Sequence, residues 1–239
     1  MKAFILAAGH GTRLRPLTDY TPKCLLPIGG IPLLQIWLGQ CRSFGITDVL
    51  VNAHSHAGHV HDFARQQTTK VNVFVAEERE LLGSAGTLAA NRKFVAGEND
   101  FFVLYGDVLT NVDLSHLLQF HRERNSAASL ALYEVPDPRR CGIVELDQDG
   151  AVIAFTEKPA HPRGNLAFAG IMVARQEIFE LIPRERPADI GFHLLPKLVG
   201  RMAGMKVDGL LLDIGTMENY RAAQAEWGTK RKHAAGNHF

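Results

Sequence analysis

Residues 4–13, Phe-Ile-Leu-Ala-Ala-Gly-His-Gly-Thr-Arg, join an apolar run to a turn of small residues and an arginine. The run Phe4–Ala7 has the length and apolar character of a buried strand, and the glycines that follow allow a tight turn. Backbone N–H groups in such a turn can approach an anion closely. The stretch therefore predicts a first strand that ends in an anion-binding loop.

Strand-like runs and helical segments alternate beyond this loop. The strand-like runs are Val49–Val51, Val71–Val75, Phe101–Leu104 and Ala128–Tyr133. The segments with helical spacing of apolar residues are Pro32–Phe44, Gly58–Gln67, Thr87–Phe94 and Leu114–Arg124. This alternation predicts βαβ units, and hence a mostly parallel sheet that is covered on both faces.

The second half of the chain is richer in strands. Asp147–Gly150 lies between two apolar runs and predicts a hairpin, because Asp-Gly favours a tight turn. Further strands are expected at Phe168–Val173 and Lys206–Leu212. A last helix is expected over Met217–Trp227, with Thr216 as its N-cap.

Composition and charge limit the kind of protein this is. The chain has 239 residues, 46% hydrophobic and 21% charged, which is enough for an ample buried core. Lys and Arg number 26 and Asp and Glu 25, so no concentrated basic field is available for nucleic acid or a membrane surface. No run is long enough for a membrane span or a signal peptide. Three scattered cysteines predict neither a disulfide framework nor a metal site. We expect a cytoplasmic enzyme or binding protein, monomeric or homo-oligomeric.

Charged residues of both signs are expected at the edge of the sheet where the anion loop lies. Arg13 and Lys23 add positive charge beside the loop. Asp107 and Asp213 each follow a strand-like run, so both can hold a divalent cation at the edge where open α/β sheets bind ligands. Turn or capping roles are the alternatives for these acids. Two carboxylates with a cationic glycine loop match transfer to or from a polyphosphate with Mg²⁺.

Four other features are less specific. Glu157-Lys158 can hold a hydroxylated, phosphorylated ligand, or it forms a solvated turn. Leu82–Thr87 opens a helix and forms either a base pocket or only the cap of that helix. The histidines of His54–His61 lack metal-ligand spacing, and we expect no metal there. Cys24 is expected to pack as a small apolar residue.

At these residues the chain resembles the sugar-1-phosphate nucleotidylyltransferases. Leu6–Lys23 is similar to the signature loop of that family, and Gly106-Asp107, Glu157-Lys158-Pro159 and Asp213–Thr216 recur in the family's order. The resemblance is greatest to short, mannose-1-phosphate guanylyltransferase-like members without the hexapeptide-repeat domain. It implies a GT-A/Rossmann-like, doubly wound α/β fold, with a mostly parallel mixed sheet and an inserted β-rich sugar-binding part.

The resemblance also implies a domain plan. Residues 1–227 would form a single nucleotidyltransferase catalytic domain. Its nucleotide-binding half would cover about 1–135 and its sugar-binding half about 136–227. Residues 228–239 are basic, polar and aperiodic, and we expect them to form a disordered tail.

Roles for individual residues follow from the same resemblance. The reaction would join an NTP to a sugar 1-phosphate and release pyrophosphate, with Arg13, Lys23 and Asp107 as catalytic residues and Mg²⁺ on Asp107 and Asp213. The nucleotide would lie against Ala8, Gly9, Gly11, Thr12, Arg13, Gly83 and Gly86. The sugar phosphate would lie against Gly142, Glu157, Lys158, Asn165 and Gly170.

The base and the sugar are less strongly indicated. The loop Glu80–Gly86 looks like the guanylyltransferase version, which favours GTP with a mannose- or heptose-1-phosphate. Phe168 stands where guanylyltransferases usually carry Asn, and it looks more like a uridylyl branch. Uridylyl or thymidylyl transfer to N-acetylmuramate or glucose 1-phosphate is therefore an alternative. A non-catalytic, nucleotide-sugar-binding regulatory subunit is another, because a fold does not fix a function.

Overall fold

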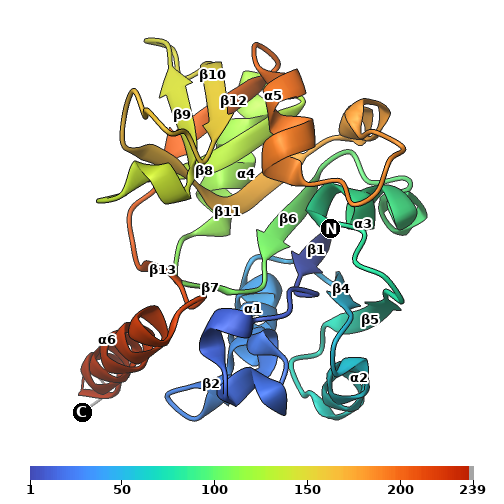
Figure 1. The fold of residues 1–239 in the computed structure, drawn as a ribbon, viewed down its shortest axis with the longest axis vertical. Helices are drawn as coiled ribbons and strands as arrows, with labels where there is room; N and C mark the ends of the chain where they lie inside the picture. Colours follow the sequence, from blue (N-terminus) through green and yellow to red (C-terminus); the bar gives the residue numbers. More distant parts are fainter. Residues whose placement is uncertain (237–239) are drawn as a thin grey trace.

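The first apolar run forms strand β1 (Lys2–Leu6), inside a nine-stranded sheet. The structure is a computed structural model that describes residues 1–236, with side chains through Trp227. β1 is parallel to both of its neighbours, β4 (Asp48–Ala53) and β6 (Phe101–Tyr105). β5 (Asn72–Glu77) adds a fourth parallel strand outside β4. These four strands have their carboxyl ends on one edge, which is where the glycine loop leaves β1 (Figure 1).

The second half of the chain extends the sheet with mostly antiparallel pairs. β11 (Leu166–Ala174) pairs antiparallel with β6 and joins the parallel strands to β9, so the main order is β10-β9-β11-β6-β1-β4-β5. The expected hairpin is present as β9 (Gly142–Leu146) and β10 (Val152–Glu157). β8 (Ala128–Glu134) and β12 (Met202–Lys206) complete this β-rich part, the upper half of Figure 1. The doubly wound α/β prediction is confirmed.

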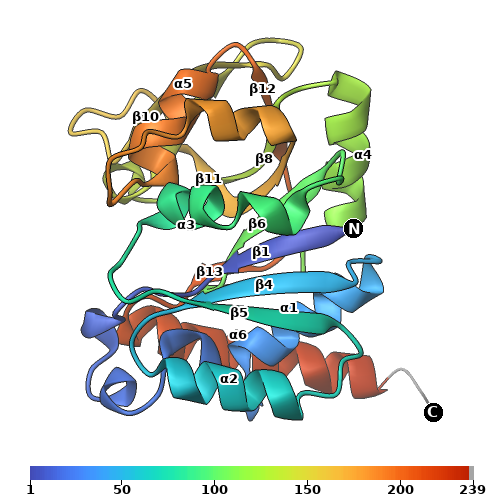
Figure 2. The ribbon, with the colours of Figure 1, turned by 90° about the vertical axis from the view of Figure 1, so that its right-hand side faces the viewer.

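Helices cover both faces of the sheet because successive residues of each strand point to opposite sides. In β1, Ala3 and Ile5 pack into one hydrophobic cluster and Phe4 packs into the other. The first cluster is covered by α1 (Leu33–Ser43), α2 (Ala57–Gln66), α4 (Leu114–Arg124) and α6 (Met217–Gly236). The second is covered by α3 (Ser84–Ala90) and α5 (Leu195–Leu198). Figure 2 shows α1, α2 and α6 on one side of β4 and β5, with α3 on the other.

The chain from Lys206 to Leu212 is not one strand, contrary to the prediction. β12 ends at Lys206, and a separate strand β13 (Leu211–Asp213) pairs with β7 (Val108–Thr110) in a two-stranded sheet. Between them Gly209 has a φ of 130°, a backbone conformation that favours glycine and breaks a strand. This break carries Asp213 out of the main sheet to the segment after β6.

The last helix is longer than expected. α6 continues to Gly236, beyond the expected end at Trp227, and residues 237–239 of the expected disordered tail lie outside the described part. Lys, Arg and Ala are frequent after Trp227, and they are good helix formers that can extend a helix already begun. The predicted N-cap is confirmed, since Thr216 Oγ1 accepts from Asn219 N at 3.2 Å.

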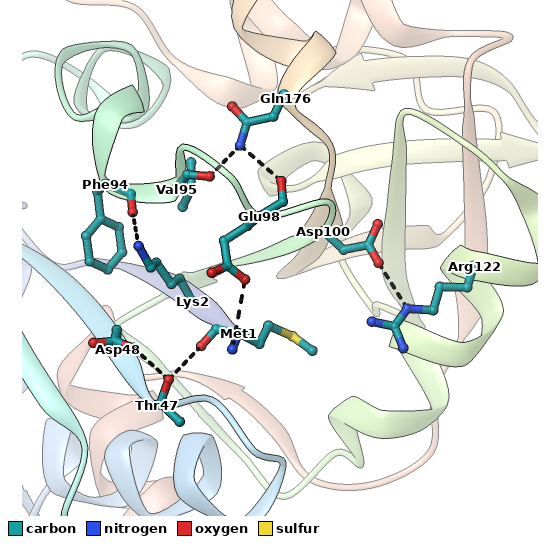
Figure 3. A network of polar contacts seen from close by, with 10 residues as sticks. All are labelled: Met1, Lys2, Thr47, Asp48, Phe94, Val95, Glu98, Asp100, Arg122 and Gln176. Carbon is teal, nitrogen blue, oxygen red and sulfur yellow. Dashed lines mark hydrogen bonds and ion pairs between the residues drawn. The ribbon is translucent and has the colours of Figure 1, made fainter.

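The opposite edge of the sheet, at the amino ends of the parallel strands, is closed by a polar network (Figure 3). Lys2 Nζ donates to the Phe94 carbonyl at 2.7 Å, and the amino group of Met1 lies 3.9 Å from Glu98 Oε2. Arg122 Nε donates to Asp100 Oδ2 at 3.0 Å nearby. These contacts tie β1 and β6 to the segments that cover them.

Candidate active site

The glycine loop begins where β1 ends and lines a cavity of about 320 Å³ with Gly9, Gly11, Thr12 and Arg13. Gly11 has a φ of 64°, and a Cβ there would lie 2.9 Å from Thr18 Cγ2. Thr18 Oγ1 donates to the Gly11 carbonyl at 2.8 Å, which fixes the turn. A Cβ on Gly9 would meet nothing within 4 Å, so the space beside Gly9 is open to a ligand. The predicted anion loop therefore has the required shape.

Lys23 lies between the two aspartates that the sequence singled out. Its Nζ donates to Asp107 Oδ2 at 2.6 Å and lies 3.6 Å from Asp213 Oδ1. The Lys23 side chain is only 11% exposed, so the two carboxylates offset the cost of burying its charge. Backbone pairing brings the acids together, because Asp213 of β13 is in register with Val108 of β7.

Arg13 joins the same cluster from the glycine loop. A Cβ on Gly215 would lie 2.9 Å from Arg13 Nη2 and 2.7 Å from Asp213 Oδ1, so the guanidinium and the carboxylate both lie beside this glycine. The Gly215 N–H donates to Asp213 Oδ1 at 2.6 Å and orients it. The four charged residues predicted for the reaction centre, Arg13, Lys23, Asp107 and Asp213, are thus brought together.

The paired carboxylates suit a metal that takes its other ligands from substrate and water. No group of three or more His, Cys, Asp or Glu side chains that could hold an ion is found in the described part of the chain. Mg²⁺ characteristically binds one or two carboxylates together with substrate phosphates and water. The donor set of Asp107 and Asp213 fits that pattern, and it does not fit a structural zinc site, which needs four protein ligands.

A second cavity, of about 340 Å³, adjoins the loop and has the character of a base pocket. Its walls are mostly apolar, and Asn52 and Glu78 are buried polar groups within it, 4% and 6% exposed. Asn52 Nδ2 donates to Glu78 Oε1 at 2.8 Å and to Thr87 Oγ1 at 2.9 Å, while Asn52 Oδ1 accepts from Ala7 N at 2.6 Å. This network fixes the Glu78 carboxylate at the carboxyl edge of the sheet.

The two glycines predicted to border the base have different surroundings. Gly83 lines the cavity with a φ of 77°, and a Cβ there would lie 2.3 Å from the Ala188 carbonyl oxygen. Gly86 does not line it; a Cβ there would lie 2.8 Å from the Arg186 side chain. Both positions therefore need glycine for close packing against the segment before α5, and only Gly83 faces the cavity. Ala8 and Gly9 line the cavity as predicted.

A third cavity, of about 210 Å³, lies on the side of the β-rich half and contains the predicted Glu157 and Lys158. Gly142 and Gly191 make room for the Glu157 carboxylate, since a Cβ on either would lie within 2.6 Å of Glu157 Oε2. Burial raises the pKa of Glu157, and Lys158, whose Nζ lies 3.6 Å from Glu157 Oε1, opposes that shift. Glu157 and Lys158 thus offer a carboxylate and an ammonium to a hydroxylated phosphate ester in this cavity.

Of the other two residues predicted for the sugar side, Gly170 lines this cavity and Asn165 does not. Gly170 lines the cavity with a φ of 74°, and a Cβ there would lie 2.9 Å from Tyr105 Cβ. Phe168 also lines it and packs edge-on against Tyr105, with ring centroids 5.7 Å apart. Asn165 does not line it: its side chain is exposed, and its backbone carbonyl accepts from Val135 N at 2.9 Å. Arg140 is a cation of this cavity that the sequence reasoning missed.

The histidine run and the cysteine next to Lys23 take structural roles. His54 Nδ1 lies 2.7 Å from the Glu78 carbonyl, and His56 stacks on His59 with centroids 5.7 Å apart. Cys24 is buried, and burial raises the pKa of its thiol to about 12, so it is not a thiolate at neutral pH. The prediction that Cys24 packs as an apolar residue is confirmed.

Asp107 lines all three cavities, so the loop, base-side and sugar-side cavities meet at one carboxylate. Together the fold and the cavities define an α/β nucleotide-binding protein of the GT-A-like class. The chain belongs to the nucleotidyl transferase family, whose model matches residues 2–230.

Individual relatives support this membership. The chain is 32% identical over 227 residues to mannose-1-phosphate guanylyltransferase 1 of Arabidopsis thaliana, covering 92% of this chain and 63% of that protein. It is also 32% identical over 238 residues to UTP–glucose-1-phosphate uridylyltransferase of Synechocystis sp., covering 92% and 61% respectively. The crystal structure of HddC from Yersinia pseudotuberculosis has the same fold, with a TM-score of 0.81, 24% identity and coverage of 95% and 99%.

Two facts bound these comparisons. The chain spans 63% of the length of the Arabidopsis relative, so it corresponds to part of that longer protein. Within the described residues, none of the helices has the length and apolar character needed to span a membrane.

Proposed function

We propose that the protein is an Mg²⁺-dependent sugar-1-phosphate nucleotidylyltransferase that converts GTP and mannose 1-phosphate, or a heptose 1-phosphate, to GDP-sugar and pyrophosphate. The observation that carries this proposal is the position of Lys23 between Asp107 and Asp213, at the carboxylate shared by the three cavities. A site that must hold two anionic substrates together needs cations at the point where their phosphates meet. The family membership supports the same reaction.

The chemistry proposed is an in-line attack of the sugar phosphate oxygen on the nucleotide α-phosphorus. A divalent ion on Asp107 and Asp213 would supply charge neutralisation at that phosphate. Lys23 has its ammonium beside both carboxylates, so we assign it to the two reacting phosphates. Arg13, on the glycine loop, is assigned to the β- and γ-phosphates, which leave as pyrophosphate. No covalent enzyme intermediate is required.

The preference for GTP rests on Glu78. Guanine presents two neighbouring N–H donors on its Watson–Crick edge, and a carboxylate can accept from both at once. Uracil and thymine present one N–H flanked by two carbonyls, which a carboxylate repels. Glu78 lines the base-side cavity. Its Oε1 already accepts from Asn52 Nδ2 at 2.8 Å and from Thr87 Oγ1, and its Oε2 accepts from Leu82 N at 3.1 Å, so Oε2 is the oxygen that we assign to a guanine N–H.

The sugar-binding assignment covers Glu157 for hydroxyls and Lys158 for the phosphate, with Gly142 and Gly170 shaping the cavity. In this proposal residues 1–227 act as one catalytic domain, with its nucleotide half at about 1–135 and its sugar half at about 136–227. Uridylyl or thymidylyl transfer to glucose or N-acetylmuramate 1-phosphate is the second candidate. It is favoured by Phe168, an aromatic side chain in the sugar-side cavity, and by the Synechocystis relative.

A matrix of nucleotides and sugar 1-phosphates tests both candidates. Each of GTP, UTP, TTP, ATP and CTP is incubated with mannose, heptose, glucose and N-acetylmuramate 1-phosphates and Mg²⁺, and pyrophosphate release is measured. We expect the highest kcat/KM for GTP with mannose or heptose 1-phosphate. A maximum with UTP or TTP would establish the second candidate. Folded protein that binds GDP-mannose but releases no pyrophosphate from any pair would instead be a regulatory subunit.

A further inference from the structure

Phe192 is a large apolar side chain that stays 54% exposed, beside the sugar-side cavity. It belongs to a single π-helical turn (Ile190–Leu194) that precedes α5. The Nζ of Lys158 lies over the face of its ring, 5.6 Å from the centroid. This exposed ring therefore contacts the cation that the proposed function assigns to the sugar phosphate.

Lys158 needs a contact of this kind because only its backbone is fixed. Its N–H donates to the Cys141 carbonyl at 2.9 Å, and its φ of 48° directs the chain sharply away from β10. The side chain is 56% exposed, and its other nearby partner is Glu157 Oε1 at 3.6 Å. A lysine held only by that carboxylate would be drawn to the sugar-hydroxyl side of the cavity. The face of the Phe192 ring gives the ammonium a second contact, and this contact leaves the positive charge available to an anion.

The position of Phe192 is set by a chain of hydrogen bonds to the base-side cavity. Asp189 Oδ1 accepts from the N–H groups of Gly191 at 2.8 Å and Phe192 at 3.3 Å. Asp189 Oδ2 accepts from Ser84 Oγ at 3.0 Å, and Ser84 Oγ accepts from Ile190 N at 2.7 Å. Ser84 lines the base-side cavity at the start of α3. The turn that carries Phe192 is therefore anchored to the nucleotide half of the molecule.

We infer that Phe192 is a positioning residue for the acceptor substrate: its ring holds the Lys158 ammonium by a cation–π contact, ready for the phosphate of a sugar 1-phosphate. The inference rests on the proposed function, since that function assigns Lys158 to this phosphate. Phe192 itself is not placed among the catalytic residues. Its contribution is to give a flexible cation a second contact beside the sugar-side cavity, in addition to Glu157 Oε1 at 3.6 Å.

The test compares Phe192→Leu and Phe192→Trp with a matched control, Phe74→Leu, which alters an exposed phenylalanine of β5 outside the three cavities. Leucine keeps apolar bulk but has no ring, and tryptophan gives the strongest cation–π contact. We expect Phe192→Leu to raise KM for mannose 1-phosphate roughly 2- to 5-fold, the size of an exposed cation–π contact, with KM for GTP unchanged. Phe192→Trp should keep or lower KM for mannose 1-phosphate.

If Phe192 served only in packing, the KM values of the variants for mannose 1-phosphate would follow a different order. If Phe192→Leu matches the wild type, or if Phe192→Trp is as impaired as Phe192→Leu, the inference is overturned. Calorimetric titration of mannose 1-phosphate into the same variants measures binding without turnover, so it separates the two proposals. Wild-type turnover without an effect at Phe192 overturns only this inference. A wild type that neither turns over nor binds the sugar phosphate overturns both.

Discussion

The backbone N–H of Ile214 donates to the carbonyl of Asp107 at 2.9 Å, which fixes the segment after β13 against the segment after β6. Two acids more than one hundred positions apart are brought to one place by main-chain pairing. The main chain, and not a contact between the two carboxylates, sets their positions, and Lys23 lies between them. Such a pair can be altered at the side chain without changing the backbone contact that places it.

Asp107→Asn should therefore lose turnover while the fold stays intact. Removing a charge that helps to stabilise the transition state costs roughly 10²- to 10³-fold in kcat. Pyrophosphate release measures the rate, and thermal unfolding measures the fold. Asp149→Asn, at an exposed turn residue between β9 and β10, is the control and should retain full activity. Near-normal turnover in Asp107→Asn would remove this residue from the metal site.

Lys23→Met should change the response to Mg²⁺ as well as abolish most turnover. In the wild type the ammonium already neutralises Asp107 and Asp213, so it competes with a divalent ion for them. Without it the two carboxylates have no cation between them, and a bound ion stabilises the folded state by mass action. We expect Mg²⁺ to raise the Tm of Lys23→Met by about 2–4 °C more than that of wild type, the equivalent of about 1 kcal/mol.

The control for this measurement is Lys93→Met, because Lys93 is exposed and lines none of the three cavities. Its Mg²⁺ response should equal that of wild type. Equal Mg²⁺ shifts in Lys23→Met and wild type would mean that the ammonium and the ion do not share one position.

Much of the fold was predictable because the strands carry their own signals. Apolar runs separated by amphipathic segments predicted β1, β4, β5, β6 and β8 to within a few residues, and Asp147–Gly150 predicted the hairpin. The division at Gly209 was not predictable from hydropathy alone. Val207 and Leu210 continue the apolar pattern on both sides of it, although the backbone breaks at Gly209 and the partner changes from β8 to β7.

The charged residues that the sequence analysis selected lie together, but the same reasoning missed two polar residues at the ends of strands. Arg13, Lys23, Asp107 and Asp213 stood out by sequence and lie together in space. Asn52 and Glu78 also follow or end apolar runs at the carboxyl edge, so the reasoning that selected Asp107 applies equally to them. Asn165 was selected only by resemblance. It directly precedes β11, where its carbonyl accepts from Val135 N, and its exposed side chain does not line the cavity.

Glu78→Gln should lower selectivity for guanine. A hydrogen bond to a charged group is worth about 1.5–3 kcal/mol, so kcat/KM for GTP should fall about 10- to 100-fold. A glutamine also offers an N–H to a pyrimidine carbonyl, so kcat/KM for UTP should not fall in parallel. The ratio of the two values is the readout, since a loss of stability that lowers the amount of folded enzyme cancels in it.

Glu80→Gln is the matched control, because Glu80 lies in the same loop but is exposed. It should leave the GTP-to-UTP ratio unchanged. A ratio in Glu78→Gln equal to that of wild type would show that this carboxylate orders the loop without reading the base.

Glu157→Gln should make the ligand-free protein more stable at neutral pH while weakening the sugar site. Burial raises the pKa of Glu157 above its ordinary value of 4.5, so the folded state binds this proton more tightly than the unfolded chain does. The stability from this group is full below pH 4.5 and is lost as the pH rises through the raised, folded-state pKa. Glutamine does not titrate, so the variant should be more stable than wild type at pH 7 and match it near pH 4.

Urea unfolding of both proteins at pH 4, 5, 6 and 7 measures this difference, with Glu226→Gln, at an exposed position of α6, as the control. A gain in stability at pH 7 is expected only if burial makes the charged form of Glu157 unfavourable in the folded protein. A carboxylate stabilised by its ion pair with Lys158 would give the opposite order, with the variant weaker at pH 7. Because the same variant should raise KM for the sugar 1-phosphate, a gain in stability accompanied by a loss of binding would identify Glu157 as a group kept buried for its ligand.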